Sequence, residues 1–358
     1  MRSSGHDRDG RVGPERMVAE DEVEREVLRM LWTFHWTSTA QLTRLVWGSN
    51  TGRHRTRLRP ILQRLYANNL IWRTTWRFLP GYRAQQRGAV SGGWFYGLTE
   101  LGKAQAAARL PALTMMHCMT REDYLSATER RTLLHSGHYT EWCTGLIEEL
   151  RRHPATAGVF VETESTALGR HLRMDGLIRL RLRQASQGVA GAVERPPWFV
   201  PWLPGLRAPL VPGLVDVTLA LEIDEGTEHL AVIEGKGENY RRTYLGGMQL
   251  PDASGAVAFP SVAWDQVLCP ANAPTDLHSR RLFFPITVLV VLGPQRLVNT
   301  WEAWQRGWSG SEVRMTSWQH IHEAGSIVRA PYVNQRQEWV GLLGHPHPYD
   351  GRLPWSTR

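Results

Sequence analysis

Cysteine is scarce in this sequence, with only Cys118, Cys143 and Cys269 among 358 residues. The three lie far apart, and no two of them have the Cys-x-x-Cys spacing of a zinc ribbon. So few cysteines also exclude a framework of disulfides. The low cysteine count is typical of proteins from a reducing compartment.

Long apolar segments are also missing. The longest, residues 283–292, is interrupted by Pro285 and Thr287, and it has about half the length that a membrane-spanning helix needs. Residues 1–22 are charged and lack the apolar core of a signal peptide. We therefore expect a cytoplasmic protein that has no membrane partner.

Acidic residues are almost absent between Thr37 and Leu110, where Glu100 is the only one. Twelve arginines and lysines against one acid leave eleven positive charges in this region, more than the +8 of the whole chain. The remainder of the chain is therefore slightly acidic. A basic region of this kind is the electrostatic signature of a protein that binds a polyanion.

Internal repeats are absent, and the chain is long enough for two or three domains. We expect a mobile tail at 1–18, a DNA-binding domain at 19–110, a linker at 111–128, a second domain at 129–335 and a C-terminal tail at 336–358. Two proline-rich insertions, 184–213 and 250–281, interrupt the second domain. Their prolines exclude regular structure there.

Three helices and a hairpin are predicted in the DNA-binding domain. Apolar residues recur at helical spacing in 21–34 and 56–69, and a short helix follows the capping candidates Thr37 and Ser38. Pro60 fits best if the third helix begins near Thr56, because a start near Thr51 would make it kink the helix. Strands at 70–78 and 94–98 complete a winged helix-turn-helix, and Thr99 can cap a further helix that runs to Arg109.

In a winged helix, the third helix enters the major groove of DNA and the hairpin tip reaches the adjacent backbone or minor groove. Double-stranded DNA is therefore the expected partner of the arginines in these segments. The alternative is a winged helix that contacts proteins and whose arginines are merely solvated. The predicted DNA contacts are Arg53, Arg55, Arg57, Arg59 and Arg64 around the third helix, and Arg83 and Arg87 in the hairpin.

The second domain is predicted to begin with a helix, three strands, a helix and a further strand. The first helix covers 129–152, and the strands lie at 158–164, 172–183, 217–224 and 284–293. A tryptophan-rich helix through Leu297 and Trp308, a short strand near 313–316 and a last strand near 326–333 follow. The αβββαβ order is that of restriction-endonuclease-like domains, so the fold class is α+β or α/β.

Two carboxylates stand together at the end of the third of these strands. Because side chains alternate along a strand, Glu222 and Asp224 point to one face and Ile223 to the other. In nuclease domains of this order, an acid on the preceding strand, here Asp175, faces the pair. These three would hold Mg²⁺ or Mn²⁺ if the protein is catalytic. The alternative is an exposed strand end whose acids suit the N-terminus of the next helix.

Active nucleases of this order usually carry a lysine two residues after the glutamate, where this chain has Asp224. Lys236 on the following helix can replace it and stabilise the transition state of phosphodiester cleavage. Gly235 and Gly237 flank Lys236, and each costs a helix about 1 kcal/mol relative to alanine. We expect the helix to be loosened or broken there.

The segment 222–240 resembles a known family. Its Glu-x-Asp-x-Gly-Thr turn, followed by Lys-x-x-x-Tyr, is similar to the replication-relaxation family of bacterial plasmid and mobile-element proteins. The resemblance extends over about 23–292, and it implies an N-terminal winged helix and a role in the replication or maintenance of mobile DNA. The residues to which it assigns importance are Asp175, Glu222, Asp224, Gly226, Thr227, Lys236, Tyr240 and the helix histidine His138.

Two functions are therefore expected. In the first, a DNA-binding protein of plasmid or mobile-element replication also cleaves or nicks DNA with Mg²⁺ or Mn²⁺. In the second, a replication initiator or transcriptional regulator binds DNA without catalysis or cofactor, and its nuclease-like domain serves oligomerisation. Both functions share DNA as the partner, together with further copies of the chain or other replication proteins of the mobile element.

Overall fold

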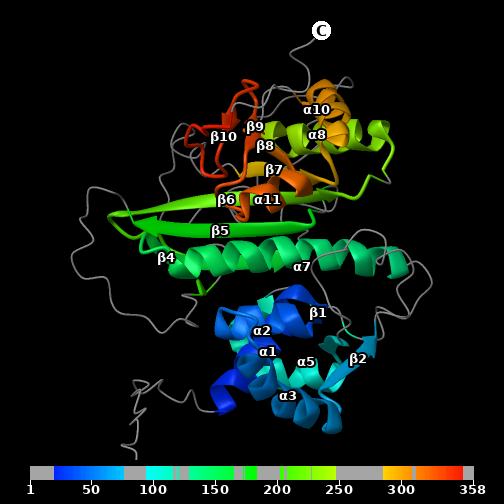
Figure 1. Ribbon diagram of the computed structural model, residues 1–358, viewed down its shortest axis with the longest axis vertical. Helices are drawn as coiled ribbons and strands as arrows, with labels where there is room; N and C mark the ends of the chain where they lie inside the picture. The colour runs from blue at the N-terminus through cyan, green and yellow to red at the C-terminus, as the bar shows by residue number, and fades with distance from the viewer. Residues whose placement is uncertain are drawn as a thin grey trace, which may run out of the picture.

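The computed structural model of the chain is shown in Figure 1. It describes residues 20–75, 94–115, 118, 120, 129–164, 172, 174–183, 202–204, 208–226, 228–246, 285–308 and 312–349. Helices and strands alternate in a mixed arrangement, so the predicted α+β class is confirmed. Arg83, Arg87, Thr227 and the insertion at 250–281 lie outside the described residues.

The N-terminal unit consists of short helices around a small sheet. Its strands pair in the order β1-β3-β2, and both pairings are antiparallel. The predicted helices and the strands at both ends of the hairpin are found. The elements are α1 (Glu20–Phe34), β1 (Thr37–Ser38), α2 (Thr39–Trp47), α3 (Gly52–Ala67), β2 (Ile71–Thr75), β3 (Trp94–Leu98), α5 (Glu100–Arg109) and the 3-10 helix η2 (Pro111–Met115).

Local side chains set the ends of these helices. Ser38 and Gln41 form a reciprocal capping box at the start of α2, and Gly48 ends it in the left-handed conformation with φ 72°. Thr51 accepts a hydrogen bond from the His54 amide, so α3 begins at Gly52, earlier than the predicted start near Thr56. Thr51 supplies the cap, so the alternative start near Thr51 is the one observed, and Pro60 lies inside the helix.

The larger unit is built on a sheet that has seven strands in the described part of the chain. Their order is β10-β9-β8-β7-β6-β5-β4. The pairings β6-β7 and β7-β8 are parallel and the others are antiparallel. The elements are α7 (Glu129–Arg152), β4 (Thr156–Thr163), β5 (Gly176–Arg183), β6 (Leu214–Asp224), α8 (Leu230–Gly246), β7 (Ile286–Val291), α10 (Pro294–Gly307), β8 (Val313–Ser317), α11 (Trp318–Ala324), β9 (Tyr332–Asn334) and β10 (Trp339–Val340).

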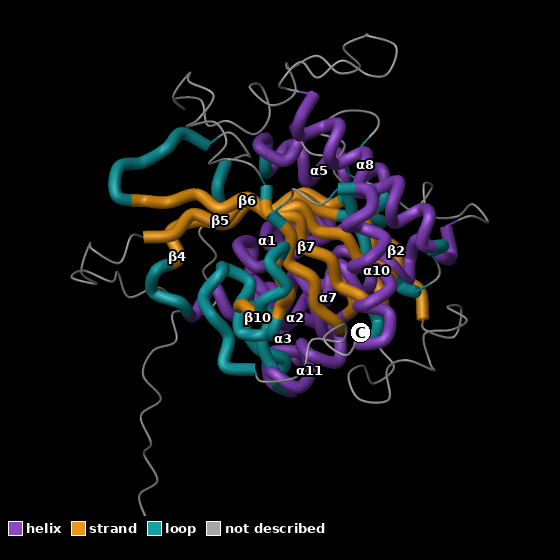
Figure 2. Tube along the Cα trace, turned by 90° about the horizontal axis from the view of Figure 1, so that it is seen from above, coloured by secondary structure: helices purple, strands orange, loops and turns teal. Residues whose placement is uncertain are grey.

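Helices cover both faces of this sheet. Leu219, Leu221 and Ile223 of β6 join a core that includes α7, whereas Ala220 joins a second core that includes α8 and α10. Figure 2 shows α8 and α10 running beside each other along their face of the sheet. Because β7 is covered on both faces, it is apolar without alternation, as the sequence predicts.

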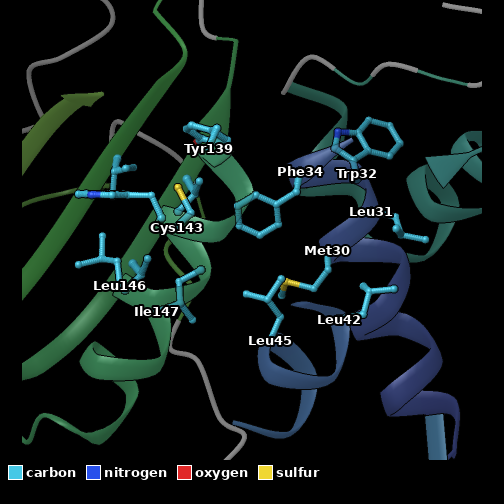
Figure 3. Close-up of a cluster of buried hydrophobic side chains, with 14 of the residues drawn as sticks. Met30, Leu31, Trp32, Phe34, Leu42, Leu45, Tyr139, Cys143, Leu146 and Ile147 are labelled. Atoms are coloured by element: carbon cyan, nitrogen blue, oxygen red, sulfur yellow. The ribbon is translucent and has the colours of Figure 1, made fainter. Parts of the chain in front are cut away.

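The N-terminal unit packs on α7, the helix that also covers one face of the larger sheet. In Figure 3, Phe34 of α1 points toward Tyr139 and Cys143 of α7, and the Phe34 and Tyr139 ring centroids are 6.4 Å apart. Around this apolar contact, Arg44 of α2 bonds to Glu141 and Glu148 of α7. Both carboxylates therefore fix the position of α2 against the larger unit.

The C-terminal part of the chain differs from the prediction in two places. Residues 327–329 form turns instead of a strand, and in the strand Tyr332–Asn334 only Val333 and Asn334 pair with β8. Glu149 of α7 accepts hydrogen bonds from the Ile327 and Val328 amides and holds this segment against the helix. The short helix α11 follows β8 directly and was not predicted. No described helix is both long enough and apolar enough to cross a membrane.

Helix α8 is continuous through Gly235 and Gly237, so the expected break near Lys236 is wrong. A Cβ on Gly237 would lie 3.1 Å from the Trp304 carbonyl oxygen of α10, and one on Gly307 would lie 2.2 Å from the Glu234 carbonyl oxygen of α8. Glycine therefore lets the two helices cross at close range. Packing against α10 compensates for the poor helix propensity of these positions.

We expect Gly307→Ala to destabilise the protein by about 1–3 kcal/mol, because its methyl group would force α8 and α10 apart. Gly235→Ala is the matched control, since a Cβ there meets nothing within 4 Å. It should stabilise the protein by up to about 1 kcal/mol through helix propensity. Urea unfolding of both variants measures the difference, and equal stabilities would contradict the close crossing.

Candidate functional site: a buried charge cluster at the end of β6

Asp175 and Glu222 lie level with each other on neighbouring strands. Gly176 at the start of β5 pairs with Leu221 of β6, and the two strands are antiparallel. Asp175, just before Gly176, therefore lies opposite Glu222, just after Leu221. The Asp175 carboxylate also accepts a hydrogen bond from the Ile223 amide at 2.7 Å. The chain thus brings these two predicted acids together at one end of the sheet.

Glu222 is held by two side chains of α8. Its Oε2 lies 3.0 Å from Lys236 Nζ, and its Oε1 accepts a hydrogen bond of 2.7 Å from the Tyr240 hydroxyl. Lys236 and Tyr240 are four residues apart, so they project from the same face of the helix. The spacing of the Lys-x-x-x-Tyr motif therefore allows both side chains to donate hydrogen bonds to the carboxylate of Glu222.

The environment of Glu222 makes its ionisation unfavourable. The residue is 3% exposed, and burial, with the nearby charge of Asp175, raises its pKa to about 7, while Lys236 and Tyr240 oppose this shift. Lys236 also contacts Glu228 Oε1 at 3.0 Å. The carboxylates around Lys236 outweigh its own burial and raise its pKa, so the ammonium stays charged.

Asp175 is paired with a histidine that the sequence analysis missed. His135 Nε2 lies 2.7 Å from Asp175 Oδ1. Burial lowers the pKa of His135, but the charge and hydrogen bond of Asp175 outweigh burial and raise it to about 9. Burial likewise raises the pKa of Asp175, and His135 reverses this shift to a net lowering. His135 lies one helical turn before His138, which was the available signal for it.

His138, the predicted helix histidine, has a different partner. Its Nδ1 lies 2.8 Å from Glu225 Oε1, just after β6. The His138 ring also packs against Trp318 of α11, with ring centroids 5.6 Å apart. This histidine therefore connects α7 with the turn that follows β6.

Asp224 belongs to a separate set of contacts. Its Oδ2 accepts from Arg296 Nε at 2.7 Å and from the Thr300 hydroxyl at 3.1 Å, and its Oδ1 accepts from the Gly226 amide at 2.8 Å. Gly226 has φ 74°, which favours glycine at this turn. Asp224 thus fixes the β6–α8 turn and anchors α10. Neither Arg296 nor Thr300 was predicted.

The predicted ligands of Mg²⁺ or Mn²⁺ are engaged by other protein groups in this arrangement. The oxygens of Asp175, Glu222 and Asp224 already accept hydrogen bonds from protein donors, several of them cationic. The described residues contain no group of three or more histidine, cysteine or acidic side chains that converges as a metal site. Lys236 and protonated His135 would, moreover, repel a divalent cation. The negative charges of the cluster are paired with the positive side chains of Lys236, His135 and Arg296.

The arginines predicted to contact DNA fall into two groups. Arg53, Arg55, Arg57 and Arg59 are exposed near the start of α3. Arg64, by contrast, bonds to Glu20 and Glu24 of α1, and Arg109 of α5 also bonds to Glu24. Arg64 therefore connects α3 with α1 through ion pairs, although its side chain stays 41% exposed.

The His135–Asp175 pair predicts a pH dependence of stability. The pKa of His135 is higher in the folded state than its ordinary value of about 6.5, so its contribution is fully present below about pH 6.5 and is lost as the pH rises through about 9. His135→Gln should therefore cost most stability near pH 6 and little at pH 10.

Urea unfolding between pH 6 and pH 10 measures this difference. His345→Gln is the control, because His345 is exposed. A cost of His135→Gln that stays constant across this range would contradict the ion pair.

Comparison with known proteins gives one match. The sequence model that represents the replication-relaxation family matches residues 28–257, more than half of the chain. No curated protein and no solved structure matches the chain significantly. The matched range contains α2, α3 and all of the predicted site residues from Arg53 to Tyr240. The protein belongs to the replication-relaxation family.

Proposed function

We propose that this protein binds double-stranded DNA in the replication or maintenance of mobile DNA, and that its N-terminal unit acts as a winged helix. The family supports a role related to replication. The observation that carries DNA binding is the outer surface of α3, where four arginines are exposed in a helix that contains no acid. Exposed guanidinium groups suit the phosphates of the DNA backbone.

The position of α3 in the molecule supports this role. Helix α2 faces α7 through Arg44, while α3 packs on α2 and β2. In Figure 1, α3 lies on the side of the N-terminal unit that faces away from the larger sheet. A duplex can therefore approach α3 without meeting the body of the protein. Arg83 and Arg87 lie outside the described residues, in the segment that connects β2 with β3, and we expect them to contact the adjacent backbone or minor groove.

We also propose that the larger unit is a restriction-endonuclease-like domain whose charge cluster has a structural role and does not hold a metal ion. Its element order, α7-β4-β5-β6-α8-β7, supports the first part. The second part rests on the pairing of the acids by Lys236, His135, Tyr240 and Arg296. In this role the domain orients the DNA-binding unit through α7, and it is a candidate surface for oligomerisation or for other replication proteins.

Metal-dependent DNA cleavage is the second candidate function. The observation that favours it is that Asp175, Glu222 and Lys236 meet at the ends of two adjacent strands, although their oxygens and ammonium group are already paired with each other or with neighbours. This candidate needs Mg²⁺ or Mn²⁺ to replace part of that pairing. It differs from the first proposal in one measurable property, the integrity of bound DNA.

Binding to DNA predicts a specific salt dependence. Arg55→Ala and Arg59→Ala should each weaken binding to a mixed-sequence duplex, and each should reduce the slope of log K against log salt by about 0.9 for every phosphate that the variant no longer neutralises. Arg242→Ala is a charge-matched control on α8, where Arg242 is exposed and bonds to Glu238. Fluorescence anisotropy at several salt concentrations measures both quantities. Equal slopes in all three variants would refute DNA binding through α3.

The charge cluster predicts that supercoiled plasmid stays intact when it is incubated with the protein and Mg²⁺ or Mn²⁺. Nicking that is present in the parent protein and absent in Glu222→Gln would instead establish cleavage. Glu228→Gln serves as the control, because it removes a partner of Lys236 without touching the two strand acids. Binding of the plasmid is measured in the same samples, so that a loss of binding is not read as a loss of cleavage.

A further inference from the structure

An arginine is held between two aromatic rings where α3 meets the small sheet. The Arg73 guanidinium carbon lies 4.2 Å from the centroid of the Tyr66 ring and 4.4 Å from that of Trp94. Tyr66 is in the last turn of α3, Arg73 is on β2, and Trp94 begins β3. Three consecutive elements of the N-terminal unit thus contribute one side chain each.

The register of the hairpin explains how these residues meet. Ile71 pairs with Leu98, Arg73 with Tyr96 and Thr75 with Trp94, and side chains of paired residues lie on the same face of an antiparallel sheet. Ile71, Tyr96 and Leu98 are buried in the core. Arg73 and Trp94 therefore lie at the outer end of the face that packs on α3.

Arg73 differs from Arg44, Arg64 and Arg109 of the same unit in having no acidic partner among the described residues. Arg44, Arg64 and Arg109 all bond to glutamates, whereas no carboxylate among the described residues pairs with Arg73. Tyr66 and Trp94 stay 44% and 40% exposed, which is unusual for large aromatic side chains. The arrangement thus keeps a full positive charge at the surface and restricts its movement.

The stack also limits what Arg73 can bind. A guanidinium whose carbon lies 4.2 and 4.4 Å from two ring centroids is approached most easily along its edge, where the N–H donors lie. Phosphate oxygens accept hydrogen bonds from that edge, often two at a time. A base, by contrast, would need to stack on a face of the guanidinium that is already covered. The chemistry therefore favours a phosphate over a nucleobase.

Arg73 is continuous with the arginines of α3. Tyr66, whose ring packs on Arg73, follows Arg59 by about two helical turns, so Tyr66 and Arg59 lie on the same side of α3. Arg59 is exposed on α3. One positively charged surface therefore extends from the helix onto the base of the hairpin.

We propose that Arg73, clamped between Tyr66 and Trp94, is a second anchoring site for a backbone phosphate of duplex DNA, beside the groove that α3 enters. The inference rests on the proposed binding of DNA through α3 and adds a contact outside that helix. Tyr66 and Trp94 act as positioning residues, because they orient the guanidinium and do not themselves bind the phosphate.

Duplex binding at several salt concentrations tests the proposal. Arg73→Ala should weaken binding about tenfold, the effect of losing a charge-assisted hydrogen bond, and should reduce the salt slope by about 0.9. Trp94→Leu keeps the charge, so we expect a loss of about threefold, in the range of one cation–π contact, with the slope unchanged. Arg73→Lys should keep the slope but not the full affinity.

The outcomes separate this inference from the proposed function. If Arg55→Ala weakens binding and Arg73→Ala matches the parent in affinity and slope, the second anchoring site is refuted and DNA binding by α3 stands. If neither variant differs from the parent, the proposed function itself is refuted. A loss in Trp94→Leu that is larger for single-stranded DNA than for duplex would overturn the phosphate site in favour of base stacking. Thermal unfolding of each variant verifies that the fold is retained.

Discussion

Burial of charge at the end of β6 is the constraint on which much of the larger unit depends. Glu222 and Asp224 are both buried there, and an unpaired buried carboxylate is strongly unfavourable. Each has partners from helices that follow β6 in the chain: Lys236 and Tyr240 of α8 for Glu222, and Arg296 and Thr300 of α10 for Asp224. Helices α8 and α10 thus pack closely on each other, and both donate hydrogen bonds to acids of the same strand, β6.

The same reasoning extends to α7 on the opposite side. His135 neutralises Asp175, and His138 bonds to Glu225, so one helix contributes to both ends of the acidic region. Further along, its Glu141 and Glu148 bond to Arg44. Helix α7 therefore contacts the charge cluster at one end and the N-terminal unit at the other, and it belongs to both units.

Much of the fold could be predicted because it follows from local patterns. Helical spacing of apolar residues indicated the extent of α7, and the continuous apolar run of β7 indicated a strand covered on both faces. The start of α3 was wrong because Thr51 caps it from outside the apolar stripe. The strand expected at 326–333 was largely wrong because Glu149, distant in sequence, holds that segment in turns.

Glu222 and Asp224 were identifiable from alternation along β6, whereas Asp175, Lys236 and Tyr240 followed from the resemblance to nuclease domains and to the family. The remaining partners of these acids were not identifiable, since Arg296 is on α10 and follows Asp224 by 72 residues. A pairing of this kind depends on which helix the fold brings to the sheet, and single-sequence periodicity does not report it. The expected metal site illustrates the difference: the acids are near one another, but their neighbours determine what they bind.

The grip of α7 on the end of α2 has a mechanical consequence. Arg151 donates to the carbonyl oxygens of Arg44 and Leu45, and Arg152 donates to that of Gly48. These carbonyls lie immediately before the turn into α3. The hydrogen bonds therefore restrict the rotation of α3 relative to α7. A force that turns α3 would act on α7 through these three backbone oxygens. Helices α3 and α7, and the sheet that α7 covers, would therefore move as one body.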